Sequence, residues 1–254
     1  MTLSTYDRIG SDYRLTRIED PRLARLITRE LRGASTILNV GAGTGSYEPT
    51  DRFVVAVEPS WVMLQQRPAT AGPAVQAIAE RLPFQNDAFD AAMAVLTVHH
   101  WSDLRVGLSE LGRVTRERIV LLTWDPSSHG FWLIKDYFPE FLEADRSRLP
   151  PIERLLSVLE DGRVIPVPIP HDCVDGFLGA YWRRPSAYLN ADVRKGISSF
   201  ATCRDLSPLQ RLAEHLETGE WHRRYGALLA AEELDIGYRL VVGRPRKWPK
   251  KETS

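Results

Sequence analysis

The chain has 254 residues, and 43% of them are hydrophobic, which is enough for one sizeable core and too much for a disordered protein. Its 33 basic and 33 acidic residues cancel, so no global field would attract nucleic acid or an anionic membrane. Cys173 and Cys203 lack the spacing of a zinc site, and the sequence shows no signal peptide and no bilayer-spanning apolar run. These features predict a cytoplasmic protein with reduced thiols.

Predicted strands and helices alternate along the first half of the chain. A helix is expected over Arg22–Leu31, with Asp20 as its cap and Gly33 as its stop. Two more helices are expected, from Ser60 to Pro68 and from Leu104 to Val114. Apolar runs typical of buried strands cover 36–40, 53–57, 74–78, 89–95 and 119–123. This alternation predicts a parallel, doubly wound α/β sheet that binds ligands at the carboxyl ends of its strands.

The pattern changes after Pro126. We expect a helix over 152–160 and then a strand over 164–169, which its prolines confine to an edge of the sheet. Amphipathic pieces of helix are expected over 173–233, and Gly237–Gly243 is a closing strand. The long interval between the last two strands is sufficient for a helical cap over the site.

A glycine-rich turn follows the first strand, with glycines at 41, 43 and 45. Such glycines allow a tight turn and the close approach of a ligand. The next strand ends on Glu58, where nucleotide-binding folds place an acid on ribose hydroxyls. The third glycine comes one residue earlier than in the dinucleotide motif, and the Gly-Lys-Ser/Thr of a phosphate loop is absent from the sequence. The pattern indicates an adenosine-containing cofactor.

Four segments, in order and at a fitting spacing, resemble the class I S-adenosylmethionine (SAM) dependent methyltransferases, of the small-molecule, type 11-like kind. They are LNVGAGTG, VVAVEPSWVM, ERLPFQNDAFDAAMAVLTVHHW and LSELGRV, within residues 35–125. The resemblance implies a Rossmann-like, mostly parallel seven-stranded sheet with an antiparallel final strand, and SAM as cofactor with S-adenosylhomocysteine (SAH) as product. It also implies an N-terminal helical lid (1–34), a SAM-binding core (35–125), the second half of the sheet with a helical acceptor cap (126–243) and a disordered basic tail (244–254).

The resemblance also assigns cofactor-binding residues. These are Asn39, Gly41, Ala42, Gly43, Gly45, Glu58, Pro59, Met63, Ala79, Glu80, Ala94 and Leu96, with Tyr13 and Arg17 from the lid. Glu58 would bind the ribose, and Pro59 and Met63 would flank the adenine, although Met63 is equally suited to helix packing.

The sequence departs from the family at two of the cofactor positions. Asn39 stands where the family often has an Asp that contacts the cofactor ammonium group, so the acceptor oxygen is kept and the charge is lost. Ile78 stands where the family has an acid that holds the adenine amino group. Backbone groups of Ala79 and Glu80 would have to replace that acid.

His99 and His100 are the candidate catalytic residues, because an imidazole is a good general base near neutral pH. Adjacent residues are expected to point in different directions, so at most one histidine should enter the pocket. The alternative for each is a buried histidine with a structural hydrogen bond. Tyr6, Trp101, Tyr181 and Trp182 are the candidate acceptor contacts, and the alternative for these aromatic residues is packing.

The favoured function is therefore methyl transfer to the oxygen, nitrogen or carbon of a small molecule, with an aromatic or hydrophobic acceptor suggested by the cap. No metal, nucleic-acid or membrane partner is expected. A SAM-binding regulatory protein without turnover is the alternative, because fold does not fix function. A nicotinamide-dependent oxidoreductase is disfavoured by the glycine spacing.

Overall fold

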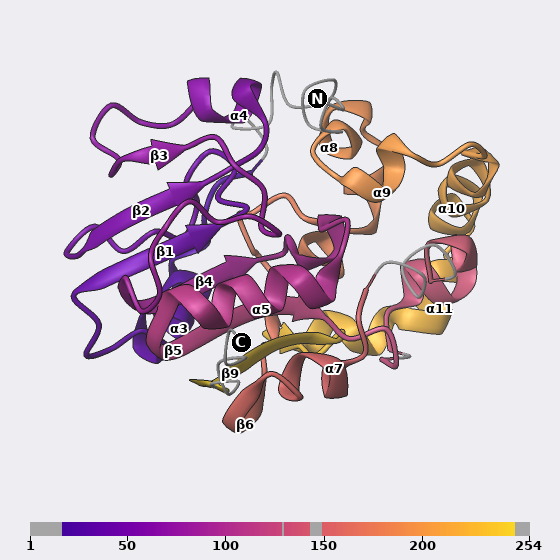
Figure 1. Ribbon diagram of the computed structural model, residues 1–254. Helices are drawn as coiled ribbons and strands as arrows, with labels where there is room; N and C mark the ends of the chain where they lie inside the picture. Colours follow the sequence, from indigo (N-terminus) through magenta and orange to yellow (C-terminus); the bar gives the residue numbers. More distant parts are fainter. Residues whose placement is uncertain (1–16, 129, 143–148, 247–254) are drawn as a thin grey trace.

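The computed structural model describes residues 17–128, 130–142 and 149–246, and its centre is a seven-stranded sheet (Figure 1). The strand order is β3-β2-β1-β4-β5-β9-β6. The strands are β1 (Thr36–Val40), β2 (Phe53–Val57), β3 (Ala74–Val75), β4 (Phe89–Val95), β5 (Thr115–Trp124), β6 (Leu159–Pro166) and β9 (Tyr238–Pro245). Neighbouring strands from β3 to β5 are parallel, whereas β9 is antiparallel to both β5 and β6. The predicted fold class is confirmed.

Two helices on opposite faces of the sheet define two apolar layers. Helix α3 (Pro21–Glu30) packs with Ile37 and Met93 on one face. Helix α5 (Leu104–Val114) packs with Leu38 and Ala92 on the other. Because side chains alternate along a strand, adjacent residues of β1 and of β4 serve opposite layers. The predicted cap of α3 is confirmed, since the Asp20 side chain accepts a hydrogen bond from the Arg22 N–H.

The segment between β6 and β9 forms a cap of short helices at the end of the sheet toward which β1, β2 and β4 point (Figure 1). Its helical elements are η3 (Leu178–Tyr181), η4 (Pro185–Leu189), α8 (Ala191–Lys195), α9 (Ser198–Ala201), α10 (Ser207–Glu217), α11 (Glu220–Tyr225) and η5 (Gly226–Ala230). A small second sheet pairs β7 (Ile169–Pro170) with β8 (Glu233–Leu234). The remaining helical elements are α4 (Trp61–Gln65), η1 (Val98–His100), η2 (Leu133–Tyr137) and α7 (Ile152–Leu156).

Several sequence-based boundaries are wrong. The strand predicted over 164–169 is β6, which begins at Leu159 and ends at Pro166, and the strand predicted over 119–123 is the longer β5. The helix predicted over 152–160 ends at Leu156, because Leu159 and Glu160 pair with β9 instead. The strand predicted over 74–78 consists only of Ala74 and Val75. The closing strand predicted to end at Gly243 continues to Pro245, so residues 244 and 245 of the predicted tail belong to β9; residues 247–254 lie outside the described residues.

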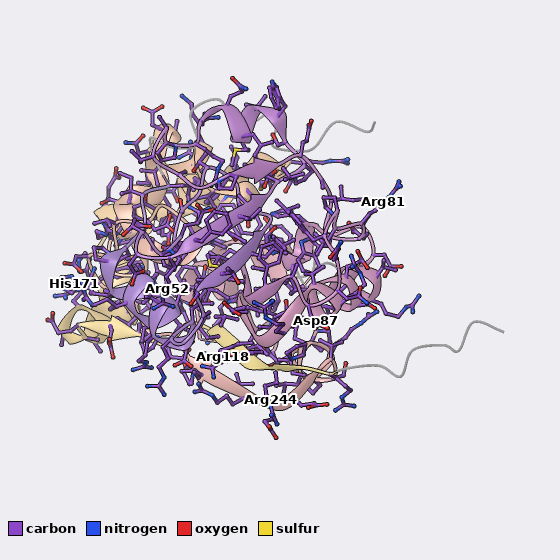
Figure 2. All side chains as sticks on the ribbon, turned by 60° about the vertical axis from the view of Figure 1, so that its left-hand side comes forward. Arg52, Arg81, Asp87, Arg118, His171 and Arg244 are labelled. Carbon is purple, nitrogen blue, oxygen red and sulfur yellow. The ribbon has the colours of Figure 1, made fainter. Side chains whose placement is uncertain are left out.

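The surface pairs basic with acidic groups, in keeping with the balanced composition. Arg244, labelled in Figure 2, shows the pattern, since it forms a 2.6 Å ion pair with Asp161. Arg118, also labelled there, instead donates to the backbone carbonyl of Glu30 at 3.1 Å. Within the described residues, none of the helices has the length and apolarity required to cross a bilayer. Both cysteines are free thiols.

Candidate cofactor and acceptor site

The glycine-rich turn begins where β1 ends. Gly41 and Ala42 donate N–H groups to the Val57 carbonyl at 2.8 and 3.0 Å, so the turn folds back against the end of β2. Gly41, Gly43 and Gly45 all have positive φ, at 71°, 55° and 96°, a region that favours glycine. A Cβ on Gly41 would lie 2.0 Å from Thr97 Oγ1, so this glycine is also required by the close approach of the chain after β4.

Glu58 lies at the carboxyl end of β2, directly beside this turn. Its side chain is buried, and its two carboxylate oxygens accept the Gly43 and Ser60 N–H groups, each at 2.9 Å. The carboxylate therefore fixes the middle of the glycine turn as well as the start of α4. This position matches the one predicted for a ribose-binding acid.

A buried polar network that the sequence analysis missed supports the turn. Asn39 is 2% exposed, and its Nδ2 donates to Glu48 Oε1 at 2.9 Å. Arg67 donates to both oxygens of the same carboxylate, at 2.9 and 2.8 Å. Asn39 Oδ1 is buried and has no hydrogen-bond partner among the described residues. An acceptor without a partner is uncommon in a protein interior, and here it lies beside a predicted cofactor turn.

The residues predicted around the adenine occupy three different environments. Met63 is buried, with Cε 3.3 Å from the position of a Cβ on Gly43, so it packs against the glycine turn. Pro59 is exposed and Ala79 is buried. The Glu80 carboxylate accepts from Ser102 Oγ and the Asp103 N–H, both at 2.9 Å, and so connects this segment to the start of α5. Ile78, which stands where the family has an acid, is 47% exposed.

The chain after β4 carries both histidines into this region. Ala94 is buried, and Leu96 has a φ of 51°, which is unusual for a residue with a side chain. The turn η1 follows at once, and the rings of His99 and His100 have centroids 3.9 Å apart. The expectation that the two rings point in different directions is wrong, because the tight helical turn brings them together. His100 is exposed and His99 is partly buried.

Two tryptophans predicted to contact the acceptor have packing roles. Trp182 is 0% exposed, its Nε1 donates to the Ile169 carbonyl and its carbonyl accepts from Trp132, so we correct its assignment to a core residue of the cap. Trp101 packs on α5, where a Cβ on Gly107 would lie 2.5 Å from its ring. Tyr181 is partly exposed, and the Arg184 guanidinium lies 4.8 Å from its ring centroid.

Arg17, predicted to bind the cofactor carboxylate, contacts a carboxylate of the chain itself. Its Nε lies 2.5 Å from Oδ1 of Asp175, a cap residue that is 1% exposed. Oδ2 of Asp175 accepts from the Tyr47 hydroxyl at 2.7 Å. No sequence signal marks this cluster, since its members come from three distant segments. Tyr6 and Tyr13 lie outside the described residues.

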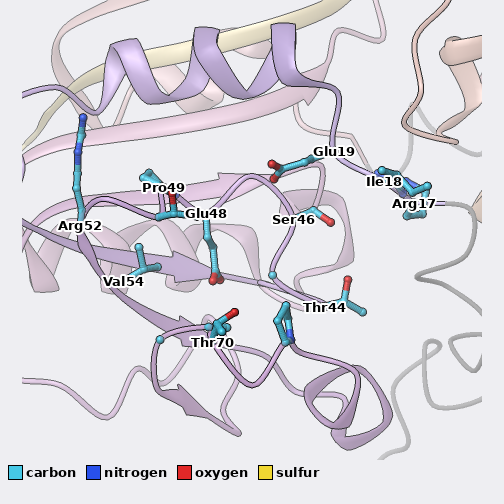
Figure 3. A pocket seen from close by; sticks show the side chains of 15 residues that line it. Arg17, Ile18, Glu19, Thr44, Ser46, Glu48, Pro49, Arg52, Val54 and Thr70 are labelled. Atoms are coloured by element: carbon cyan, nitrogen blue, oxygen red, sulfur yellow. The ribbon is translucent and has the colours of Figure 1, made fainter.

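A cavity of about 580 Å³ lies beside the glycine turn (Figure 3). It is lined by Thr44, Gly45, Ser46, Glu48 and Val54 among others, with Arg17 and Glu19 from the segment before α3. Of the predicted cofactor residues that the structure describes, only Gly45 and Arg17 line it. It occupies the α3 side of the turn, where residues 41–52 form no helix.

Taken together, the turn, the strand-end carboxylate and the sheet order are typical of nucleotide-binding α/β proteins, which bind their ligands at the carboxyl edge of the sheet. Adding a Cβ at any of the three glycines would strain or crowd the turn, as expected for a backbone that a ligand approaches closely. Among the described residues, no group of three or more His, Cys, Asp or Glu could hold a metal ion.

Comparison with known proteins identifies the class. Residues 38–122 match the family model of a methyltransferase domain. A protein from Anabaena variabilis, described as a methyltransferase from an antibiotic biosynthesis pathway, has a structure with a TM-score of 0.82 and 38% identity, over 90% of this chain and 98% of that one. A demethylmenaquinone methyltransferase of Mycolicibacterium gilvum is 30% identical over 156 residues, which are 56% of this chain and 68% of the relative.

A more distant structure agrees in fold. The phosphoethanolamine N-methyltransferase 2 of Haemonchus contortus, in complex with SAM, has a TM-score of 0.57 at 12% identity, over 96% of this chain and 58% of that one. The chain belongs to the class I SAM-dependent methyltransferase family. Its methyl donor is SAM and its cofactor product is SAH. The glycines, which leave the backbone of the turn open to close approach, and the buried Asn39 Oδ1 without a partner among the described residues are compatible with such a group.

Proposed function

We propose that this methyltransferase acts on a small molecule, by in-line displacement at the carboxyl edge of β1 and β4. The observation that carries the proposal is the contact between the two turns at that edge, since a Cβ on Gly41 would lie 2.0 Å from Thr97 Oγ1. His99 and His100 follow Thr97 closely, so they lie near the cofactor turn. The cofactor supplies the electrophilic methyl group, and the protein positions the acceptor and removes a proton where needed.

The cofactor placement in this proposal follows the carboxyl edge of the sheet. Glu58 binds the ribose hydroxyls, and Gly41, Gly43 and Gly45, with Ala42 between them, line the methionine end. Asn39 Oδ1, a buried acceptor without a partner among the described residues, receives the cofactor ammonium group. A charged donor there would satisfy an oxygen that otherwise costs about 1–3 kcal/mol to bury.

The adenine lies between two segments in this proposal. Pro59 and Met63 are on one side, and the backbone of Ala79 and Glu80 is on the other. The hydrogen bonds of Glu80 to Ser102 and Asp103 support this side, because they fix the backbone that would replace the missing acid at position 78. Ala94 and Leu96 face the sulfonium from the end of β4.

The acceptor is proposed to be aromatic or hydrophobic and to contact Tyr181 in the cap. Partial exposure of Tyr181, with Arg184 beside its ring, supports this assignment. The names of two relatives support a small organic acceptor. One is a demethylmenaquinone methyltransferase, and the other is described as part of an antibiotic biosynthesis pathway. We place the reaction in the cytoplasm, as the sequence predicts.

Calorimetric titration with SAH, and with NADH as the control ligand, tests the cofactor site. Micromolar binding of SAH alone is expected. Methyl transfer from SAM to a panel of phenols, quinols, amines and short carboxylic acids then tests the acceptor class. Competition by short acids but not by ring compounds would refute the aromatic acceptor. Tight SAH binding without turnover on any acceptor would favour the alternative of a SAM-binding protein.

His99→Asn and His100→Asn test the proposed base. One of the two should lose about 10²- to 10⁴-fold in turnover, the range of general-base catalysis, while SAH affinity stays within about threefold. The other should remain active and is the matched control, because it makes the same chemical change on the neighbouring ring. Turnover within threefold of wild type for both variants would show that neither histidine removes the proton.

A further inference from the structure

The cofactor turn has to be held in place without a helix of its own. Parallel neighbouring strands are usually joined through a helix, yet residues 41–52 between β1 and β2 form only turns. The loop contains Tyr47 at a φ of 68°, a left-handed backbone that costs about 1–3 kcal/mol unless its surroundings impose it. Contacts from outside the loop must therefore impose this conformation.

Tyr47 supplies those contacts from both its backbone and its side chain. Its N–H donates to Glu19 Oε2 at 2.9 Å, just before α3. Its side chain is 2% exposed, and its hydroxyl donates to Asp175 Oδ2 in the cap at 2.7 Å. Burial, together with the Asp175 charge, raises the pKa of Tyr47, so the hydroxyl stays protonated and remains a donor.

Asp175 brings the three segments together. Its buried carboxylate accepts from Tyr47 and, at 2.5 and 3.2 Å, from Nε and Nη2 of Arg17, in the segment before α3. A second connection runs beside it, where the Val174 N–H donates to Asp20 Oδ2 at 3.2 Å. Hydrogen bonds to a charged group are stronger than neutral ones, and the Asp175 carboxylate at their centre is buried, so removing one partner leaves buried polar groups unpaired.

We propose that Tyr47 and Asp175 are positioning residues through which the cap sets the geometry of the cofactor turn. Cofactor affinity then depends on a cap contact 128 residues away in sequence from the turn. The inference rests on the proposed placement of SAM at Gly41–Gly45, because Tyr47 follows that turn directly. When the cap contact is lost, the turn samples other conformations, and binding must reorder it.

The test is Tyr47→Phe, which removes one hydroxyl and keeps the ring. SAH affinity, measured by calorimetry well below the unfolding temperature, should fall about tenfold, or ~1.4 kcal/mol. The matched control is Tyr188→Phe, since Tyr188 is also fully buried in the cap and donates its hydroxyl to the Leu178 carbonyl at 2.7 Å. This control should lower the unfolding temperature and leave SAH affinity unchanged.

A double-mutant cycle distinguishes coupling from general damage. Asp175→Asn removes the charge from this contact and alone should weaken SAH binding. Adding Tyr47→Phe should cost less than it does in the wild type, because both changes act on the same contact. Amide hydrogen exchange in residues 41–52 should become faster in Asp175→Asn, although the substitution is in the cap.

Equal SAH affinities for wild type, Tyr47→Phe and Asp175→Asn would overturn the coupling alone, and so would equal weakening by the Tyr188→Phe control. Absence of SAH binding by the wild type would refute the cofactor placement itself. If Asp175→Asn does not fold, the pair Tyr47→Phe and Tyr188→Phe still decides the question.

Discussion

Replacing Glu58 with Ala should remove both a structural and a ligand-binding contact. The carboxylate is 5% exposed and accepts the Gly43 and Ser60 N–H groups, each at 2.9 Å. A hydrogen bond to a charged group contributes about 1.5–3 kcal/mol, so losing two should lower the free energy of unfolding by ~3 kcal/mol or more. Without the proposed ribose contact and with Gly43 released, SAH affinity should fall more than tenfold, or ~1.4 kcal/mol.

Calorimetric titration with SAH, alongside urea unfolding, measures both effects. The control is Asp90→Ala, because Asp90 Oδ2 also accepts two backbone N–H groups, from Ser35 at 3.0 Å and Thr36 at 2.8 Å, but at the amino end of the strands. It should lose stability and keep its SAH affinity. Glu58→Gln, which retains an acceptor oxygen, serves if the Ala variant is unfolded. Unchanged SAH affinity in a folded Glu58 variant would refute the cofactor placement.

Two further predictions concern the turn and the start of α3. Gly41→Ala should abolish SAH binding or folding. The added change Thr97→Ala should not restore either, since the φ of 71° stays unfavourable and the Thr97 Cβ remains 2.8 Å from the added Cβ; full recovery would refute both reasons. Burial alone would raise the pKa of Asp20, but hydrogen bonds from Arg22 and the Val174 N–H outweigh it and lower the pKa to about 2. This lowered pKa stabilises the fold above the unfolded pKa of about 4, and the contribution is lost as the pH falls toward 2. The difference in urea unfolding free energy between wild type and Asp20→Asn should therefore narrow from pH 5 downward, and a constant difference would contradict the assignment.

The parts of the fold that the sequence predicted are those with local causes. Buried parallel strands are continuous apolar runs, so β1, β2 and β4 were found at their observed bounds. Asp20 caps its helix by accepting the Arg22 N–H, two residues away, which is within the reach of a short motif. Glu58 was found for the same reason, because it follows a strand directly.

The missed features depend on residues that are far apart in sequence. The start of β6 contains polar residues and a register shift between Glu160 and Arg163, and only pairing with β9 makes it a strand. Trp182 is predicted as an acceptor contact because a cluster of aromatic residues in the sequence is as typical of a binding pocket as of a hydrophobic core. The contact between Tyr47 and Asp175 leaves no periodicity in either segment.

Asn39 and Glu48 show how such a distant contact changes the meaning of a motif. An Asn at position 39 removes a charge that the family often has beside the cofactor. Glu48 brings a carboxylate to within 2.9 Å of Asn39 Nδ2, which turns the amide so that Oδ1 remains as the acceptor. Arg67 pairs with that carboxylate, and both side chains are nearly buried. Breaking such a pair leaves an uncompensated buried charge, so the pair fixes the amide strongly. Asn39 can therefore serve as a neutral acceptor for the ammonium group in the proposed site. The charge of Glu48 is paired with Arg67, and its carboxylate orients the Asn39 amide.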